Sequence, residues 1–174
     1  MRLHEEHFEA VRRYAWRRDP EIADDITAET FAVAWRRLDD VPDDARPWLI
    51  GVARHARLNV RRSQRRQANV VAALERAHVP ADVAGLGAGE LMPELEAALR
   101  ALAPADREVL LLHAWDELGS AEIAVALGCS KANASLRLHR AKRRFEKAFA
   151  ARRREAQSTH RSSTAHREGV VDGY

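Results

Sequence analysis

Residues 120–149 are SAEIAVALGCSKANASLRLHRAKRRFEKAF, and this stretch decides the fold of the C-terminal half of the chain. It predicts a short helix, a tight turn and a longer helix rich in cations. Gly128 can adopt the left-handed conformation that ends the first helix. The Ser130 hydroxyl can then cap the second helix by accepting a hydrogen bond from a free backbone N–H. The pattern is typical of a helix-turn-helix.

The second of these helices has two contrasting faces. Apolar residues recur every three or four positions and share a buried face: Ala134, Leu138, Ala141, Phe145 and Phe149. The opposite face combines small and polar side chains with flanking cations, as a helix in the DNA major groove requires. A solvated basic face on a helical bundle is the alternative. Because the turn and both faces agree, we favour DNA contact through Lys131, Ala132, Ser135, Leu136, Arg137, His139, Arg140, Arg143 and Arg144.

Composition and charge layout fit a soluble helical protein with several partners. The 174 residues are 46% hydrophobic and 32% charged, which allows one ordinary domain or two small ones. The net charge is only +3, yet residues 48–66 hold six arginines and no acid. Residues 20–30 hold acids and no cation. Because a basic patch attracts phosphate and an acidic patch repels it, we expect separate surfaces for separate partners.

Several function classes are disfavoured by the residues that the chain contains. Cys129 is the single cysteine, which excludes an internal disulfide and a cysteine-rich zinc site. His4 and His7 have helical spacing but no third metal ligand nearby, so packing roles are the better interpretation. No phosphate-binding loop or catalytic constellation is found. We therefore expect no catalytic residue, metal or cofactor. We also expect a cytoplasmic protein, since neither a membrane-length apolar run nor a signal peptide is seen.

The N-terminal part predicts three helices. The first runs from Leu3 to Trp16, the second from Pro20 to about Leu38, and the third begins at Pro47 and continues past Arg66. A polar loop, Asp39 to Arg46, separates the second and third helices. The predicted buried stripe of the second helix is Ile22, Ile26, Phe31, Trp35 and Leu38.

The third helix combines a core face with a basic face. The predicted core residues are Leu49, Val52, Ala53, Ala56 and Val60. Arginines at 54, 57, 61 and 65 line one flank, and polar groups at 55, 59 and 62 line the other. A phosphate backbone could lie along the arginines. An exposed arginine-rich helix without a partner is the alternative, but the second basic helix of the chain favours nucleic acid.

The chain therefore divides into two helical blocks. Residues 79–89, VPADVAGLGAG, predict a flexible linker between a first domain, residues 1–78, and a second domain, residues 90–154. Residues 155–174 are polar and patternless, which predicts a disordered tail. The expected fold class is all-α, with two small helical domains.

Longer segments of both blocks resemble a known family. The segments ADDITAETFAVAWRRLDDVP, residues 23–42, and RPWLIGVARHARLNVRRSQRR, residues 46–66, resemble the second region of bacterial RNA polymerase sigma factors. Residues 99–145, LRALAPADREVLLLHAWDELGSAEIAVALGCSKANASLRLHRAKRRF, resemble their fourth region. Because only a short linker separates them, the resemblance is to the extracytoplasmic-function (ECF) group, and it covers residues 3–150.

The resemblance implies a function and partners. Such a protein binds core RNA polymerase, at the clamp of the largest subunit and the flap of the second, and directs initiation at promoter DNA. An anti-sigma factor is a further partner that the family admits, and no membrane contact is implied. The helix from Lys131 corresponds to the one that recognises the −35 element. The residues corresponding to the clamp contact are Asp25, Glu29, Phe31 and Trp35.

The resemblance also places the −10 element on the first block, where separated strand is recognised. Aromatic and polar groups suit that task, because an unpaired base needs stacking and edge hydrogen bonds. The corresponding residues are Asp39, Asp40, Arg46, Trp48, Arg54, His55, Arg57, Asn59, Arg61 and Arg62. The alternative function is a helix-turn-helix transcriptional regulator that binds duplex DNA without polymerase, usually as a symmetric dimer.

Overall fold

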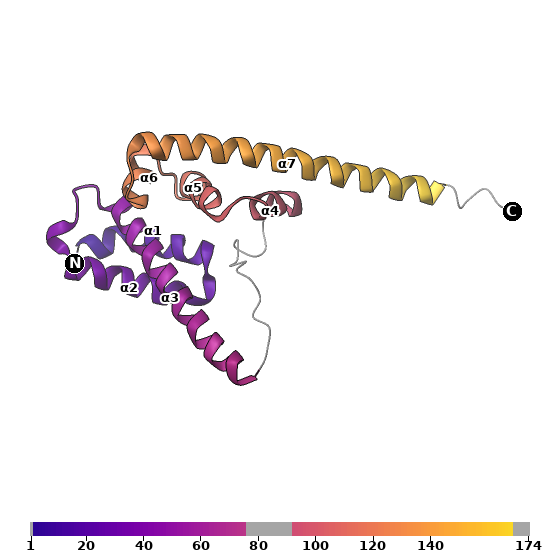
Figure 1. The fold of residues 1–174 in the computed structure, drawn as a ribbon. Coiled ribbons are helices and arrows are strands. Elements are labelled where there is room, and N and C mark those ends of the chain that lie inside the picture. Colours follow the sequence, from indigo (N-terminus) through magenta and orange to yellow (C-terminus); the bar gives the residue numbers. More distant parts are fainter. Residues whose placement is uncertain (1, 76–91, 169–174) are drawn as a thin grey trace.

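The computed structural model describes residues 2–75 and 92–168, and the regular elements in these ranges are all helical. The predicted all-α fold is confirmed, while the predicted linker, residues 79–89, lies outside the described residues. The N-terminal block contains α1 (Arg2–Arg18), η1 (Pro20–Ile22), α2 (Ala23–Arg36), η2 (Leu38–Asp40) and α3 (Ala45–Glu75). The C-terminal block contains α4 (Pro93–Arg100), α5 (Pro104–Ala114), α6 (Ser120–Leu127) and α7 (Lys131–Glu168) (Figure 1).

Helix α2 buries a different stripe from the predicted one. Ile26, Thr27, Thr30 and Ala34 face the core, whereas Trp35 is 70% exposed and Leu38 is 49% exposed. The prediction that Trp35 and Leu38 are buried is therefore wrong. The two threonines enter the core because their hydroxyls donate to carbonyls one turn earlier, at 2.7 and 2.6 Å.

Helix α3 begins earlier than predicted, at Ala45, so Arg46 is helical and only residues 41–44 lie between η2 and α3. The predicted loop from Asp39 to Arg46 is thus too long at both ends. The predicted core residues of α3 are largely confirmed: Leu49, Ala53 and Ala56 are buried, and Val52 and Val60 are partly buried.

The helix-turn-helix has the predicted geometry. Gly128 ends α6 with a φ of +62°, which is the left-handed region. The Ser130 Oγ accepts a hydrogen bond from the Asn133 N–H at 3.2 Å, which caps α7. Ala134, Leu138 and Ala141 are buried beneath the helix, as expected.

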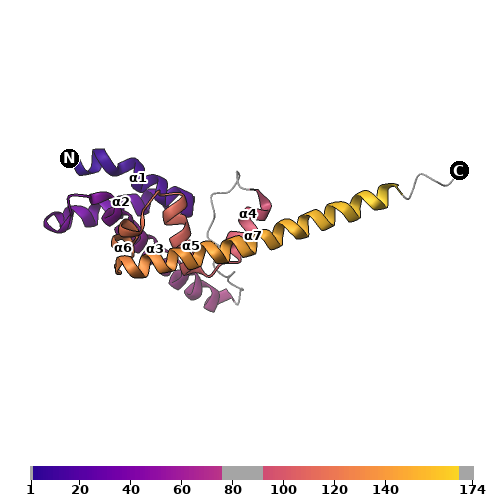
Figure 2. The same ribbon diagram turned by 90° about the horizontal axis from the view of Figure 1, so that it is seen from above.

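Helix α7 is longer than predicted. It continues to Glu168, whereas a disordered tail was predicted from residue 155. Figures 1 and 2 both show its C-terminal half projecting beyond the other helices. Residues 150–168 contain no glycine or proline, and extending an existing helix avoids the cost of nucleation. Residues 169–174 of the predicted tail lie outside the described residues.

The two blocks share one hydrophobic core, which the sequence did not predict. Leu112, Leu118 and Ile123 of the C-terminal block belong to the same buried cluster as Leu49 and Ile50 of α3. A smaller cluster joins α4 and α5 to α7 through Leu99, Leu102, Leu110, Leu111 and Ala141. No helix within residues 2–75 or 92–168 is long and apolar enough to span a membrane.

Candidate nucleic-acid and polymerase surfaces

The outward face of α7 is open to solvent. Every residue predicted to contact duplex DNA, from Lys131 to Arg144, is exposed. Part of this face forms an open hollow of about 410 Å³. It is lined by Leu136, His139, Arg140, Arg143, Arg144 and Lys147. Lys147 was missed in the sequence, although it lies one turn beyond Arg143 on the same face.

One of these cations already has an ion-pair partner in the C-terminal block. Arg144 of α7 forms an ion pair with Asp106 in the first turn of α5. Arg137, Arg140 and Arg143 form no ion pair with any described residue. A cation without a protein partner can bind a phosphate and release its counterions. These three arginines are therefore better candidates for DNA contacts than Arg144.

The predicted clamp residues are not gathered on one face of α2. Asp25 and Glu29 are one helical turn apart and exposed, and Glu29 pairs with Arg36 at 3.2 Å. Trp35 is exposed on another side of the helix, about a third of a turn away. Phe31 is half-buried, and its ring centroid lies 6.3 Å from Phe8. Phe31 therefore serves the packing of α1 on α2 at least as much as an outside contact.

The predicted −10 residues fall into two groups. Some are exposed to solvent, and the others contact other residues of the chain. His55, Asn59 and Arg62 are exposed on one flank of α3, and Asp39 and Asp40 are exposed in η2. Half-buried Trp48 has its ring centroid 5.8 Å from the Arg37 guanidinium, which pairs with Asp40 at 2.8 Å. Arg54 is half-buried on the opposite flank. Arg46 donates to the Asp116 carbonyl at 2.5 Å and thus contacts the C-terminal block.

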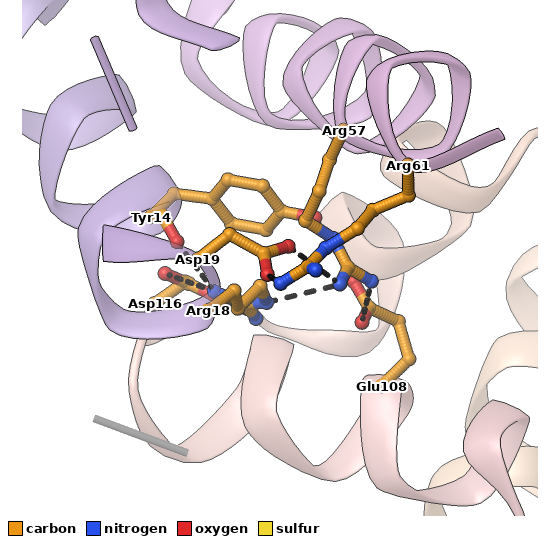
Figure 3. A network of polar contacts seen from close by, with 7 residues as sticks. All are labelled: Tyr14, Arg18, Asp19, Arg57, Arg61, Glu108 and Asp116. Atoms are coloured by element: carbon orange, nitrogen blue, oxygen red, sulfur yellow. Dashed lines mark hydrogen bonds and ion pairs between the residues drawn. The ribbon is translucent and has the colours of Figure 1, made fainter. Parts of the chain in front are cut away.

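Arg57 and Arg61 belong to a buried ionic network between the two blocks (Figure 3). Both arginines pair with Asp19, whose side chain is 0% exposed, and the Arg57 Nη1 lies 3.2 Å from its Oδ2. Arg57 Nη2 also lies 3.5 Å from the Glu108 Oε2 of α5. In this structure the guanidinium groups of both arginines face carboxylates, and their assignment as DNA contacts stays a prediction.

Two residues of α1, Arg18 and Tyr14, complete this network. Arg18 at the end of α1 pairs with Asp116, with 2.6 Å between Nη2 and Oδ2. The Tyr14 hydroxyl donates to the Glu108 Oε1 at 3.1 Å. We call the set the ionic network: Tyr14, Arg18, Asp19, Arg57, Arg61, Glu108 and Asp116.

Burial and charge shift the ionisation of the network in opposite directions. Burial raises the pKa of Asp116, and the nearby Arg18 offsets only part of this effect. Burial also acts to raise the pKa of Glu108, but Arg18 and Arg57 outweigh it, so this pKa is lowered. The two arginines thus favour the charged form of Glu108.

The comparisons with known proteins assign both blocks to one family. The chain matches Sigma-70 region 2 over residues 3–67 and Sigma-70 region 4 over residues 93–145. It is 32% identical over 150 residues to a Mycobacterium tuberculosis protein named ECF RNA polymerase sigma factor SigL, covering 81% of this chain and 83% of that one. It is 33% identical over 128 residues to RNA polymerase sigma factor NccH of Alcaligenes xylosoxydans xylosoxydans, covering 68% of each.

A solved structure has the same fold. It contains the sigma factor RpoE of Bartonella quintana in complex with the anti-sigma factor NepR, and superposes with a TM-score of 0.59 at 19% identity. The match covers 86% of this chain and 95% of that one. Both regions match in this chain, and the relatives that it matches are named RNA polymerase sigma factors, which decides against a polymerase-independent regulator. The chain belongs to the ECF group of the sigma-70 family of RNA polymerase sigma factors.

Proposed function

We propose that this sigma factor divides promoter recognition between its two blocks. Region 4, residues 90–154, binds the −35 duplex with the exposed face of α7. Region 2, residues 1–78, binds the separated −10 strand with the exposed flank of α3 and residues 39–46. The observation that carries the proposal is the hollow on α7, where Arg140, Arg143 and Lys147 surround apolar and polar side chains open to solvent.

The family directs transcription initiation with core RNA polymerase, and region 2 offers a surface for it. Asp25 and Glu29 give α2 an exposed acidic face, which is complementary to a basic partner surface. Trp35 supplies an exposed aromatic side chain, of the kind enriched in protein interfaces. We assign these three residues to the clamp contact of the largest subunit, and region 4 to the flap of the second.

Two further assignments follow from this role. The solved sigma factor RpoE of Bartonella quintana, which has this fold, is bound to the anti-sigma factor NepR, and this supports a partner of that class for this chain. We also propose that the protein acts in the cytoplasm as a non-enzymatic factor without a cofactor, because its proposed partners are polymerase and chromosomal DNA.

The experiment is run-off transcription with purified chain, core polymerase and genomic promoter fragments. We expect discrete transcripts only when the chain and core polymerase are both present. Arg143→Ala should reduce these transcripts, while Arg152→Ala serves as the matched control. Arg152 is an exposed arginine on the same helix that pairs with Glu155 outside the hollow. Transcripts that do not depend on the chain would contradict the proposal.

A further inference from the structure

Leu136 is an exposed leucine on a face of α7 that is otherwise polar or charged. It is 47% exposed. Within residues 131–157, whose side chains the structure describes, it is the one large apolar residue that is exposed. The other residues that line the hollow on α7 are histidine, arginine and lysine. A partner that enters this hollow therefore meets one apolar side chain among cations.

Packing within the chain does not explain Leu136. The α-helix turns by about 100° per residue, so Leu136 lies about 200° from Ala134 and from Leu138 around the axis. Both of those residues are buried, and Leu136 thus points away from the core. Single exposed leucines are common on protein surfaces, so exposure alone assigns no role. The evidence for a role is the position of Leu136 on the face proposed to bind DNA.

The position of Leu136 along α7 favours contact with base edges. A recognition helix places its N-terminal residues nearest the base edges, and Leu136 lies in the second turn of a helix that begins at Lys131. Ala132, one turn earlier on the same face, has only a methyl side chain and does not cover it. Arg140 and Arg143 follow toward the C-terminus, where they can bind phosphates.

The major groove offers one apolar group to such a side chain. Base edges carry hydrogen-bond acceptors and amino donors, and leucine can neither donate to them nor accept from them. Covering such a group with leucine would leave it without a hydrogen bond, which is unfavourable. The C5-methyl group of thymine is the exception, because it is apolar and projects into the groove. Leucine in this position therefore favours a T·A pair over the other pairs.

We propose that Leu136 recognises the C5-methyl group of one thymine in the −35 element. This rests on the proposed function, because it requires that the exposed face of α7 enters the major groove there. The leucine side chain covers the methyl group and excludes water from it, while Arg140 and Arg143 bind neighbouring phosphates. The chain therefore prefers a T·A pair at one position of the element.

Removing the methyl group alone tests this contact. Deoxyuridine lacks only the C5-methyl group of thymidine and keeps its base pairing. Holoenzyme assembled from the chain and core polymerase is bound to a promoter fragment whose −35 sequence comes from a randomised-promoter selection. Each −35 thymine is replaced in turn by deoxyuridine. We expect replacement at one position to weaken binding about fourfold, as for the exposure of one methyl-sized apolar group.

Leu136→Ala assigns the contact to the leucine. This variant should bind the thymine and deoxyuridine fragments with equal affinity, because the alanine side chain is too short to cover the methyl group. Circular dichroism should be unchanged, since residue 136 is exposed. Leu58→Ala is the matched control, because it shortens an exposed leucine of α3, outside the hollow, and it should keep the fourfold difference.

Adding a methyl group gives the converse measurement. At the sensitive position the T·A pair is changed to C·G, with either cytosine or 5-methylcytosine in the place of the thymine. These two fragments differ only by a methyl group at the same place in the groove. The parent should bind the methylated fragment about fourfold more tightly, and Leu136→Ala should not distinguish the two.

Three results would overturn the proposal: a selected −35 element without a T·A pair, no loss of affinity with deoxyuridine at any position, or an equal loss in the parent and in Leu136→Ala. In the last case another residue would contact the methyl group. Arg143→Ala separates these results from a failure of the proposed function. If this variant still weakens binding, the −35 assignment of α7 stands without the methyl contact. If it does not, the −35 assignment and the methyl contact both fail.

Discussion

The salt dependence of −35 duplex binding gives a quantitative test of the α7 surface. Beyond the first turn of α7, four exposed cations of this face form no ion pair with a described residue: Arg137, Arg140, Arg143 and Lys147. If each neutralises one phosphate, the slope of log K against log salt is about −3.6, from about −0.9 per contact. Raising salt from 50 to 200 mM then weakens binding by about 150-fold.

Arg140→Ala should change this slope by one contact. The expected slope is about −2.7, so the same rise in salt weakens binding by only about 40-fold. Fluorescence anisotropy of a labelled −35 duplex across this salt range measures both slopes. Arg152→Ala, at an arginine of α7 outside the hollow, should keep the parent slope. A parent slope in Arg140→Ala would refute the assignment of Arg140 to a phosphate.

The other surfaces make three further predictions. Changing Asp25 and Glu29 together to Lys should weaken binding to core polymerase at least tenfold in a pull-down with unchanged circular dichroism; unchanged affinity would remove α2 from the clamp contact. Ser135→Arg should alter the preferred −35 sequence in a randomised-promoter selection, because an arginine can bind guanine edges that serine cannot; an identical preferred sequence would exclude Ser135 as a base contact. The stability of the fold should respond to pH in two steps. Lowering the pH from neutrality protonates Asp116 first, because burial raises its pKa from the ordinary 3.8, and this raises the free energy of unfolding. Below the ordinary 4.5 of Glu108 the free energy of unfolding should fall, because the fold holds the pKa of Glu108 below that value; a single monotonic change in thermal denaturation would contradict these directions.

Local features of the fold were predictable because they depend on short-range chemistry. Gly128 and Ser130 specify the turn and cap of the helix-turn-helix through their own backbone and hydroxyl groups. The buried stripe of α7 follows from helical periodicity, and Ala134 and Leu138 are buried as predicted. The burial of Thr27 and Thr30 was not predicted. Their hydroxyls donate to backbone carbonyls one turn earlier, and a hydropathy pattern does not show such hydrogen bonds.

The association of the two regions could not be predicted from the sequence. Arg57 is separated from Glu108 by 51 residues, and Arg18 from Asp116 by 98. An i,i+4 pair such as Arg57 and Arg61 has the same appearance in sequence whether its partner is a carboxylate or a phosphate. The burial of Asp19 could not be predicted from the sequence, because an acidic residue that follows the end of a helix is ordinarily exposed to solvent. Only the packing of α6 on α3 brings these charges together.

The division of the promoter between the two regions is the central claim, and permanganate footprinting tests it most directly. Holoenzyme assembled with the parent chain should make thymines around the start site reactive and should protect the −35 element. Replacing residues 39–46 with a Gly/Ser segment of equal length should abolish the thymine reactivity while −35 protection remains, because α7 is unchanged. This replacement also removes the Arg46 contact to Asp116, so circular dichroism of the variant provides the control for folding. Thymine reactivity that survives the replacement would contradict the claim, because strand separation would then depend on residues outside this segment.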